Sequence, residues 1–347
     1  CGDHPGAGYH RGSFVMIDLT VIWACIIGFA IIAYVVMDGF DLGIGILFPF
    51  FKVGKDRDTA MNSIAPVWDG NETWLVMGVG GLLAAFPLAY AIILPALYAP
   101  MIAMLLGLVF RGVAFEFRWR DPAHRAFWDR AFTLGSIVAT FAQGIALGAL
   151  LQGITVKGRA YAGGWWEWLS PFSLLTGVGL VVGYALLGAC WLNWKTEDAL
   201  QRQAVTYAGR LGILLLIMIG AISFATLTLE AQYHQRWLSY PGVLATAQVP
   251  LATVIVTFLF YRSLRLVRDA QPFLWALTLF GLCLVGLGVS IWPDVIPARV
   301  TIWDAAAPHR SQVFMLVGAA IMVPIILAYT AWSYWVFRGK VGQDGYH

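Results

Sequence analysis

Charged side chains are scarce in this sequence, as are paired cysteines and histidines outside loops. Of the 347 residues only 12% are charged, whereas 60% are hydrophobic. A soluble globular domain is about a quarter charged and about half apolar. This composition excludes an ordinary soluble fold and indicates a protein whose solvent is largely lipid.

The cysteines exclude a disulfide framework and a thiolate metal site. Cys25, Cys190 and Cys283 each stand alone in an apolar stretch, without the paired spacing of a zinc site or a redox dithiol. A buried unpaired cysteine behaves as a small hydrophobic residue. We expect these three cysteines to fill space inside helices.

Histidine is missing from the interior of the apolar stretches. The six histidines lie in tails and loops: His4, His10, His124, His234, His309 and His347. A haem within a bilayer normally needs a histidine or a similar axial ligand on a helix, and methionines in helices are usually packing residues. The sequence therefore predicts that this chain holds no haem of its own and no metal, with His309 as the one weak exception.

Eight runs without charged residues are long enough to cross a bilayer, which takes about 20 apolar residues per helix. The second run has 38 residues, enough for two spans, and Phe86-Pro87 is the expected turn because proline ends the preceding helix. The sequence predicts an all-α polytopic membrane protein with about nine transmembrane helices. The runs cover residues 19–37, 73–110, 131–156, 168–194, 211–229, 237–261, 270–293 and 311–337.

Basic residues divide unequally between the two sides of such a protein. With nine helices, the loops of one side hold 16 lysines and arginines and the other side holds 6. Because cytoplasmic loops carry the excess, the N-terminus is predicted outside and the C-terminus in the cytoplasm. Along the chain we interpret residues 1–15 as a non-native or disordered tail before a start at Met16, with an ordered functional tail as the alternative. Residues 16–340 are expected to form one transmembrane domain and residues 341–347 a cytoplasmic tail.

The charges that do interrupt apolar stretches gather in the first three predicted helices. Asp38 and Asp41 share one helical face, Asp69 and Glu72 fall in the first turns of the second helix, and Arg111 ends the third. Charges inside a membrane are costly and usually mark ion or proton paths. We predict that these four carboxyl groups form a proton path whose buried members are neutralised by Arg111.

Other interpretations of these residues stay open. Asp69 near a helix N-terminus also suits the helix dipole without any path. Arg111 can also be an ordinary basic residue of the cytoplasmic side, as Arg118 and Arg120 are expected to be. Glu116 and Arg118 are expected to form an ion pair at the membrane interface. For the whole chain, a proton-coupled secondary transporter and a purely structural scaffold are the alternatives.

Five stretches carry a resemblance to a known family. They are Asp38-Gly-Phe-Asp-Leu-Gly, Leu151-Gln-Gly, Thr301-Ile-Trp-Asp and the segments 62–74 and 323–335. On these stretches the chain resembles subunit II of the cytochrome bd family of quinol oxidases, in its cyanide-insensitive branch, from about Met16 to Gly339. Segment 62–74, which reads Asn-Ser-Ile-Ala-Pro-Val-Trp-Asp-Gly-Asn-Glu-Thr-Trp, is the most specific, and Glu72 stands where some relatives have glutamine.

The resemblance implies a heterodimer with a haem-bearing subunit I that oxidises quinol and reduces dioxygen to water. It implies that subunit I holds haems b and d, or haem b alone, and that this chain holds no haem. For this chain it also implies a fold of two four-helix bundles plus one peripheral helix. Small accessory subunits and a structural quinone or lipid are compatible with it. Protons released outside and taken from the cytoplasm would make the reaction electrogenic.

Carried over position by position, the resemblance also assigns roles to residues. The acidic residues assigned to cytoplasmic proton delivery are Asp38, Asp41 and Asp69. Trp68 and Arg111 match positions that support this region, and Trp74 matches the entrance of an oxygen channel in some relatives. A tryptophan in a membrane helix is more often a packing or interface residue, so the assignment of Trp74 is the weakest of these.

Overall fold

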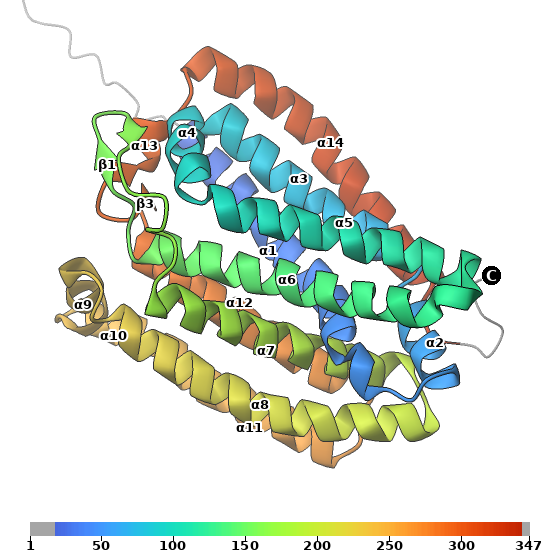
Figure 1. Cartoon of the computed structure of the whole chain (residues 1–347). Coiled ribbons are helices and arrows are strands. Elements are labelled where there is room, and N and C mark those ends of the chain that lie inside the picture. Colours follow the sequence, from blue (N-terminus) through green and yellow to red (C-terminus); the bar gives the residue numbers. More distant parts are fainter. Residues whose placement is uncertain (1–17, 342–347) are drawn as a thin grey trace, which may run out of the picture.

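The computed structural model describes residues 18–341, in which long helices run side by side (Figure 1). Eight of the described helices are long and apolar enough to cross a membrane, and α3 is a less apolar ninth because it begins with Trp-Asp-Gly-Asn-Glu. The predicted all-α polytopic fold is confirmed. The nine helices are α1 (Leu19–Leu47), α3 (Trp68–Ala85), α5 (Tyr98–Arg120), α6 (Arg125–Leu151), α7 (Pro171–Lys195), α8 (Asp198–Thr226), α11 (Gln248–Arg265), α12 (Gln271–Ile291) and α14 (His309–Val336).

Short elements lie at the two ends of the long helices (Figure 1). The end we call the hairpin end carries the antiparallel pairs β1 (Val156–Lys157) with β2 (Ala160–Tyr161) and β3 (Asp294–Ile296) with β4 (Val300–Thr301), and the helices α4 (Pro87–Ala96), α9 (Ala231–Leu238), α10 (Gly242–Thr246) and α13 (Ile302–Ala305). The opposite end, called the α2 end, carries η1 (Phe48–Phe50), α2 (Lys55–Asn62) and η2 (Pro122–His124).

The two termini of the described chain lie at opposite ends of the molecule. Trp303 Nε1 of α13 donates to Asp18 Oδ2 at 2.7 Å, which fixes the start of α1 at the hairpin end. The last described residue, Val341, lies at the α2 end, where its backbone N–H donates to the carbonyl oxygen of Lys195, the last residue of α7. A chain that crosses a membrane an odd number of times has its two ends on opposite sides. Which side each end faces stays a prediction. The tail predicted at residues 1–15 lies outside the described residues, as do residues 342–347 of the predicted C-terminal tail.

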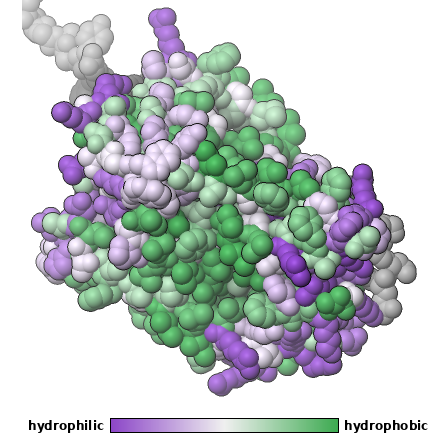
Figure 2. All heavy atoms as spheres, viewed as in Figure 1, coloured by the Kyte–Doolittle hydropathy of each residue, from purple (hydrophilic) through white to green (hydrophobic). Residues whose placement is uncertain are grey.

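The surface is divided in the way that a bilayer requires. Figure 2 shows, on the face in view, hydrophobic residues gathered over the middle of the long helices and hydrophilic residues towards both ends. Large apolar side chains are exposed well inside the long helices, for example Ile217 of α8 at 61%, Phe258 of α11 at 66% and Ile321 of α14 at 58%. In water such patches would be unfavourable, whereas lipid tails solvate them.

The helices form two groups of four and one peripheral helix, as expected. In the first group α1 packs against α3 and α6, and α5 packs against α6; in the second, α7 packs against α8 and α12, and α11 against α12. α7 joins the groups because it also packs against α1 and α6. α14 contacts α1 and α3, and its most apolar stretch has no buried residue.

A glycine pair sets the distance between the two groups. A methyl group on Gly43 of α1 would overlap the backbone carbonyl oxygen of Tyr184 in α7, and one on Gly188 would lie 2.5 Å from the carbonyl carbon of Gly43. The obstructing atoms are backbone and cannot rotate away. Small residues at such a crossing let membrane helices approach closely, and here they hold the acidic part of α1 against α7.

Several predicted boundaries are wrong in detail. The helix after Phe86 is α4, and a second break at Leu97 separates it from α5, so the turn between the two spans is wider than expected. The run 237–261 is interrupted at Pro241, and its spanning helix α11 begins only at Gln248. Apolar runs locate a span, whereas prolines and local hydrogen bonds decide where the helix ends.

Candidate functional site

A buried ion cluster connects α1, α3 and α5. It consists of Asp38, Asp41, Glu72 and Arg111 and is called here the carboxylate–arginine cluster. Arg111 Nη1 lies 2.5 Å from Asp38 Oδ1 and 3.3 Å from Glu72 Oε1, and Arg111 Nη2 lies 3.9 Å from Asp41 Oδ2. The side chains of Asp38, Asp41 and Arg111 are at most 1% exposed, whereas that of Glu72 is 29% exposed. The structure thus brings four of the predicted residues into contact.

The cluster lies deeper than the sequence predicted. α1 continues nine residues beyond Asp38 to Leu47, which is roughly 14 Å at 1.5 Å per residue. Arg111 was expected to end the third helix, but α5 continues to Arg120. The charges interrupt an apolar pattern without ending a helix, because a paired charge within a bundle does not need to reach water.

Asp69 stands apart from the cluster, at the start of α3. It is exposed, and its side chain makes no ion pair or hydrogen bond with other residues of the range 18–341. Glu72 lies three residues further along the same helix, so the two carboxyl groups share a face. The three acidic positions therefore run from exposed Asp69 through half-buried Glu72 to buried Asp38.

The two tryptophans singled out from the sequence are both packing partners. The Trp68 ring lies 5.6 Å from the guanidinium carbon of Arg111 and stacks on Phe115 at 5.2 Å, an arrangement that stabilises a desolvated cation. Trp74 is 1% exposed and meets the edge of Phe29 at 5.5 Å. Phe29 in turn lines an open apolar groove of about 340 Å³ between α1 and α14. An oxygen route past Trp74 stays a prediction.

Two residues that the sequence did not single out complete the site. Asn71 of α3 is 1% exposed, and its Nδ2 donates to Asp41 Oδ2 at 2.7 Å and to the Met37 carbonyl at 3.2 Å. The Tyr334 hydroxyl of α14 donates to Asn71 Oδ1 at 3.0 Å. Both residues lie in segments that carried the resemblance, 62–74 and 323–335, but nothing in the sequence indicates that Tyr334, 263 residues away, reaches Asn71.

A second polar chain begins one helical turn before Asp38. Tyr34 is four residues before Asp38 on the same face of α1. Gln143 Nε2 of α6 donates to the Tyr34 hydroxyl at 2.7 Å, and the Tyr184 hydroxyl of α7 donates to Gln143 Oε1 at 3.0 Å. These groups satisfy one another in the bundle interior, where an unpaired polar group would cost several kcal/mol.

The cluster has unused hydrogen-bonding capacity. Asp38 Oδ2 and Asp41 Oδ1 are buried, and no residue in the described part of the chain bonds to them. Three carboxyl groups also face a single guanidinium, so full ionisation would leave excess negative charge in a medium of low dielectric constant. Such an arrangement can take up a proton and release it again.

A separate group of ions ties α2, α5 and α6 together at the α2 end. Arg118 is 1% exposed and pairs with Asp129 at 2.5 Å and with Asp58 at 2.8 Å. The expected Glu116–Arg118 pair is therefore wrong: Glu116 instead pairs with Arg120 at 3.5 Å, because residues two apart point to different sides of a helix. Asp129 was missed because α6 begins at Arg125, before its charge-free run.

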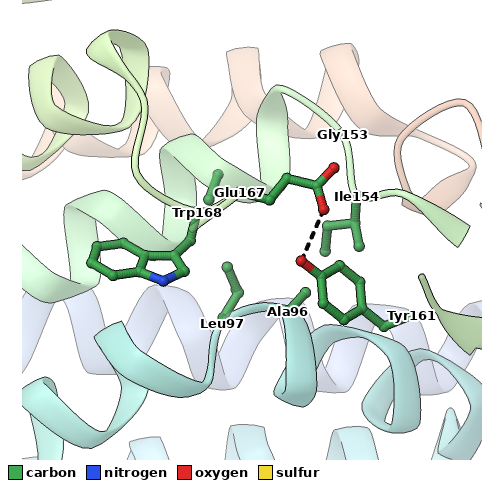
Figure 3. Close-up of a pocket in the computed structure, with 8 residues that line it drawn as sticks. Ala96, Leu97, Gly153, Ile154, Tyr161, Glu167 and Trp168 are labelled. Atoms are coloured by element: carbon green, nitrogen blue, oxygen red, sulfur yellow. Dashed lines mark hydrogen bonds between the residues drawn. The ribbon is translucent and has the colours of Figure 1, made fainter. Parts of the chain in front are cut away.

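The hairpin end has a small recess lined in part by Glu167 and Tyr161, which point toward each other in Figure 3. The Tyr161 hydroxyl donates to Glu167 Oε2 at 2.8 Å. Burial and this carboxylate raise the pKa of Tyr161 to about 12. The recess has room for only about one water molecule, so it is no substrate site.

Metal-binding side chains do not cluster in the described residues. No group of three or more His, Cys, Asp and Glu there is arranged to hold a metal ion. His124, His234 and His309 are all exposed, and His309 is the first residue of α14. The expectation that this chain holds no haem stays a prediction.

Comparisons with known proteins agree on one family. The family model described as cytochrome bd terminal oxidase subunit II matches residues 19–337. The cytochrome bd-I ubiquinol oxidase subunit 2 of Escherichia coli K12 is 30% identical over 369 residues, covering 95% of this chain and 97% of that protein. The cytochrome bd ubiquinol oxidase subunit 2 of Bacillus subtilis is 27% identical over 343 residues, covering 94% and 98%.

A solved structure shares the fold. One chain of the bd oxidase from Geobacillus thermodenitrificans superposes with a TM-score of 0.74 and 17% identity, covering 92% of this chain and 99% of that one. At this identity the match shows the arrangement of helices alone.

Proposed function

Because this chain belongs to the cytochrome bd terminal oxidase subunit II family, we propose that it works as subunit II of a quinol oxidase beside a haem-bearing subunit I. The curated relatives are named as subunits of cytochrome bd ubiquinol oxidases, which are oxidoreductase complexes. The chain is a multi-pass protein of the bacterial inner membrane. In the proposed reaction, subunit I oxidises quinol and reduces dioxygen to water.

This chain contributes no haem ligand in this proposal. The described histidines are exposed, and the polar side chains of the site are carboxyl, guanidinium, amide and hydroxyl groups. Such groups bind and move protons, whereas electron transfer needs a redox centre. Electron chemistry is therefore assigned to subunit I, and the haems b and d, or b alone, belong there.

The role proposed for this chain is proton delivery from the cytoplasm. A proton from water binds at exposed Asp69, passes along the face of α3 to Glu72, and enters the cluster around Arg111. Asp38 and Asp41 each keep one buried oxygen without a hydrogen-bond partner among the described residues, so either can accept it. The guanidinium lets a carboxylate exist in this interior, and a proton on one oxygen removes the charge that Arg111 does not balance.

The observation that carries this proposal is the graded exposure of the acidic residues. Exposed Asp69, half-buried Glu72 and buried Asp38 form a sequence from surface to interior, and Arg111 touches the last two. The proposal needs the α2 end to face the cytoplasm. Most of the lysines and arginines lie in the connections of that end or in the helix turns next to them, which supports this orientation. Proton uptake there makes the reaction electrogenic.

Oxygen consumption by the purified complex tests the proposal. We expect Asp41→Asn and Asp69→Asn each to slow turnover at least tenfold while subunit stoichiometry and haem spectra stay those of the wild type, since a proton relay typically contributes about 100-fold or more. Asp198→Asn is the matched control, because Asp198 is also exposed and also begins a helix at the α2 end. Its replacement should leave turnover unchanged.

The same experiment separates the alternatives. Turnover at the wild-type rate in both Asp variants would exclude the proton path and leave a structural scaffold. A scaffold role predicts that the Asp variants either fail only in assembly, by losing subunit I or haem, or do not fail at all. A proton-coupled transporter is disfavoured because the cluster is built by α1, α3 and α5, and no residue of α7, α8, α11 or α12 belongs to it, whereas a transporter places its site between two repeats.

A further inference from the structure

The last turn of α14 contacts Asn71, the hydrogen-bond partner of Asp41, although the rest of α14 is peripheral. Trp332 and Trp335 are 63% and 55% exposed, whereas Tyr334 between them is half-buried. Its ring lies 6.2 Å from the ring of Trp191 on α7, and its hydroxyl donates to Asn71 Oδ1 at 3.0 Å. One side chain of this peripheral helix therefore reaches the proton site.

Asn71 passes this contact on to Asp41. Its amide nitrogen donates both to Asp41 Oδ2 at 2.7 Å and to the Met37 carbonyl at 3.2 Å, and its amide oxygen accepts from Tyr334. If the Asn71 amide were rotated by half a turn, its oxygen would face Asp41 Oδ2 and the Met37 carbonyl oxygen, which are both acceptors. The hydrogen bonds therefore fix the orientation of the amide. A donor on the amide oxygen also polarises the amide and strengthens its N–H bonds to acceptors. The chain from Tyr334 through Asn71 thus stabilises the carboxylate of Asp41.

The position of Tyr334 is held by a brace at the end of α7. Lys195 Nζ donates to the Phe337 carbonyl at 2.9 Å and to the Gly339 carbonyl at 3.2 Å, and the backbone N–H of Val341 donates to the Lys195 carbonyl at 2.8 Å. Lys340 adds an ion pair to Asp269 at 3.2 Å. These bonds begin three residues after Tyr334. They fix the end of a helix that makes few other contacts inside the bundle.

We infer that Tyr334 is a positioning residue for Asp41, acting through the Asn71 amide, and that the Lys195 brace holds it in place. This inference rests on the proposed proton path for its effect on turnover. Its structural part, the influence of Tyr334 on the Asp41 carboxyl group, stands independently of that path. Tyr334 itself carries no proton in this mechanism.

The test uses the whole oxidase complex with Tyr334→Phe and, as a matched control, Tyr329→Phe. Tyr329 lies on the same helix, but its side chain is 64% exposed. The infrared carboxyl band of Asp41 is identified as the band that disappears in Asp41→Asn. We expect this band to shift in Tyr334→Phe and to stay in place in Tyr329→Phe. Turnover should fall roughly twofold to fivefold in Tyr334→Phe, as the loss of one hydrogen bond allows, with a larger solvent deuterium isotope effect.

The outcomes separate this inference from the proposed function. If the Asp41 band is the same in Tyr334→Phe as in the wild type, or shifts equally in Tyr329→Phe, the positioning role is overturned. If Asp41→Asn keeps full turnover, the proton path fails, while the band still decides the role of Tyr334. Lys195→Gln tests the brace, since an unshifted Asp41 band in that variant would overturn it.

Discussion

Replacing Arg111 by leucine removes the guanidinium that three carboxyl groups share. Arg111 is fully buried and lies 2.5 Å from Asp38, so its loss leaves acidic side chains without a counter-charge inside the bundle. Removing one partner of a buried ion pair typically costs about 3–5 kcal/mol. We therefore expect Arg111→Leu to lower the unfolding midpoint of the purified complex on the order of 5–10 °C and to abolish fast turnover.

A double-mutant cycle shows whether this cost comes from the pair itself. Asp38→Leu removes the nearest carboxyl group, and Arg111→Leu combined with Asp38→Leu leaves neither charge. If the pair is coupled, the double variant loses less stability than the two single variants added together, by about 1–3 kcal/mol. Thermal unfolding followed by circular dichroism in one detergent gives the four free energies.

The control for this cycle lies on the same helix. Arg120 pairs with Glu116 at 3.5 Å, but the two side chains are 76% and 57% exposed. An exposed pair of this kind is worth about 0.5 kcal/mol or less, so Arg120→Leu should barely move the midpoint. Equal losses in Arg120→Leu and Arg111→Leu, or strictly additive losses in the cycle, would refute the reasoning.

Two further predictions concern packing and pH. Gly43→Ala should prevent accumulation of the assembled complex, because the added methyl group overlaps the Tyr184 backbone. Gly28→Ala is the control and should be tolerated, since nothing lies within 4 Å of the new atom. The amount of this chain in washed membranes is the measurement, and equal amounts of the two variants would contradict the prediction. The hydrogen bond from Trp303 holds the pKa of Asp18 below its usual value of 3.8, so the bond contributes stability above that value and loses it as the pH falls through the lowered pKa. The difference in unfolding midpoint between wild type and Trp303→Phe should therefore shrink as the pH is lowered from about 5, and a constant difference would assign the effect to packing instead.

Much of the site was predictable because its residues are unusual where they stand. Carboxyl groups at positions 38, 41, 69 and 72 are conspicuous in apolar stretches, and Arg111 comes at the matching level of the third helix. The contacts of Arg111 with Asp38 and Glu72 confirm that these residues meet. The proton path, the oxygen route at Trp74, the membrane orientation and the cyanide-insensitive branch stay predictions.

The sequence by itself determined roughly where the membrane spans lie and that charged residues interrupt the first three of them, because hydropathy is a local property of consecutive residues. Only the tertiary structure decided which polar groups pair, since that depends on the rotation and crossing of helices far apart in the chain. It separated exposed Asp69 from buried Asp38, moved Arg118 from an interfacial pair with Glu116 to a buried group with Asp129, and brought Tyr334 to Asn71. The scarce charges of this chain were therefore visible in its sequence, while their partners became visible only in its fold.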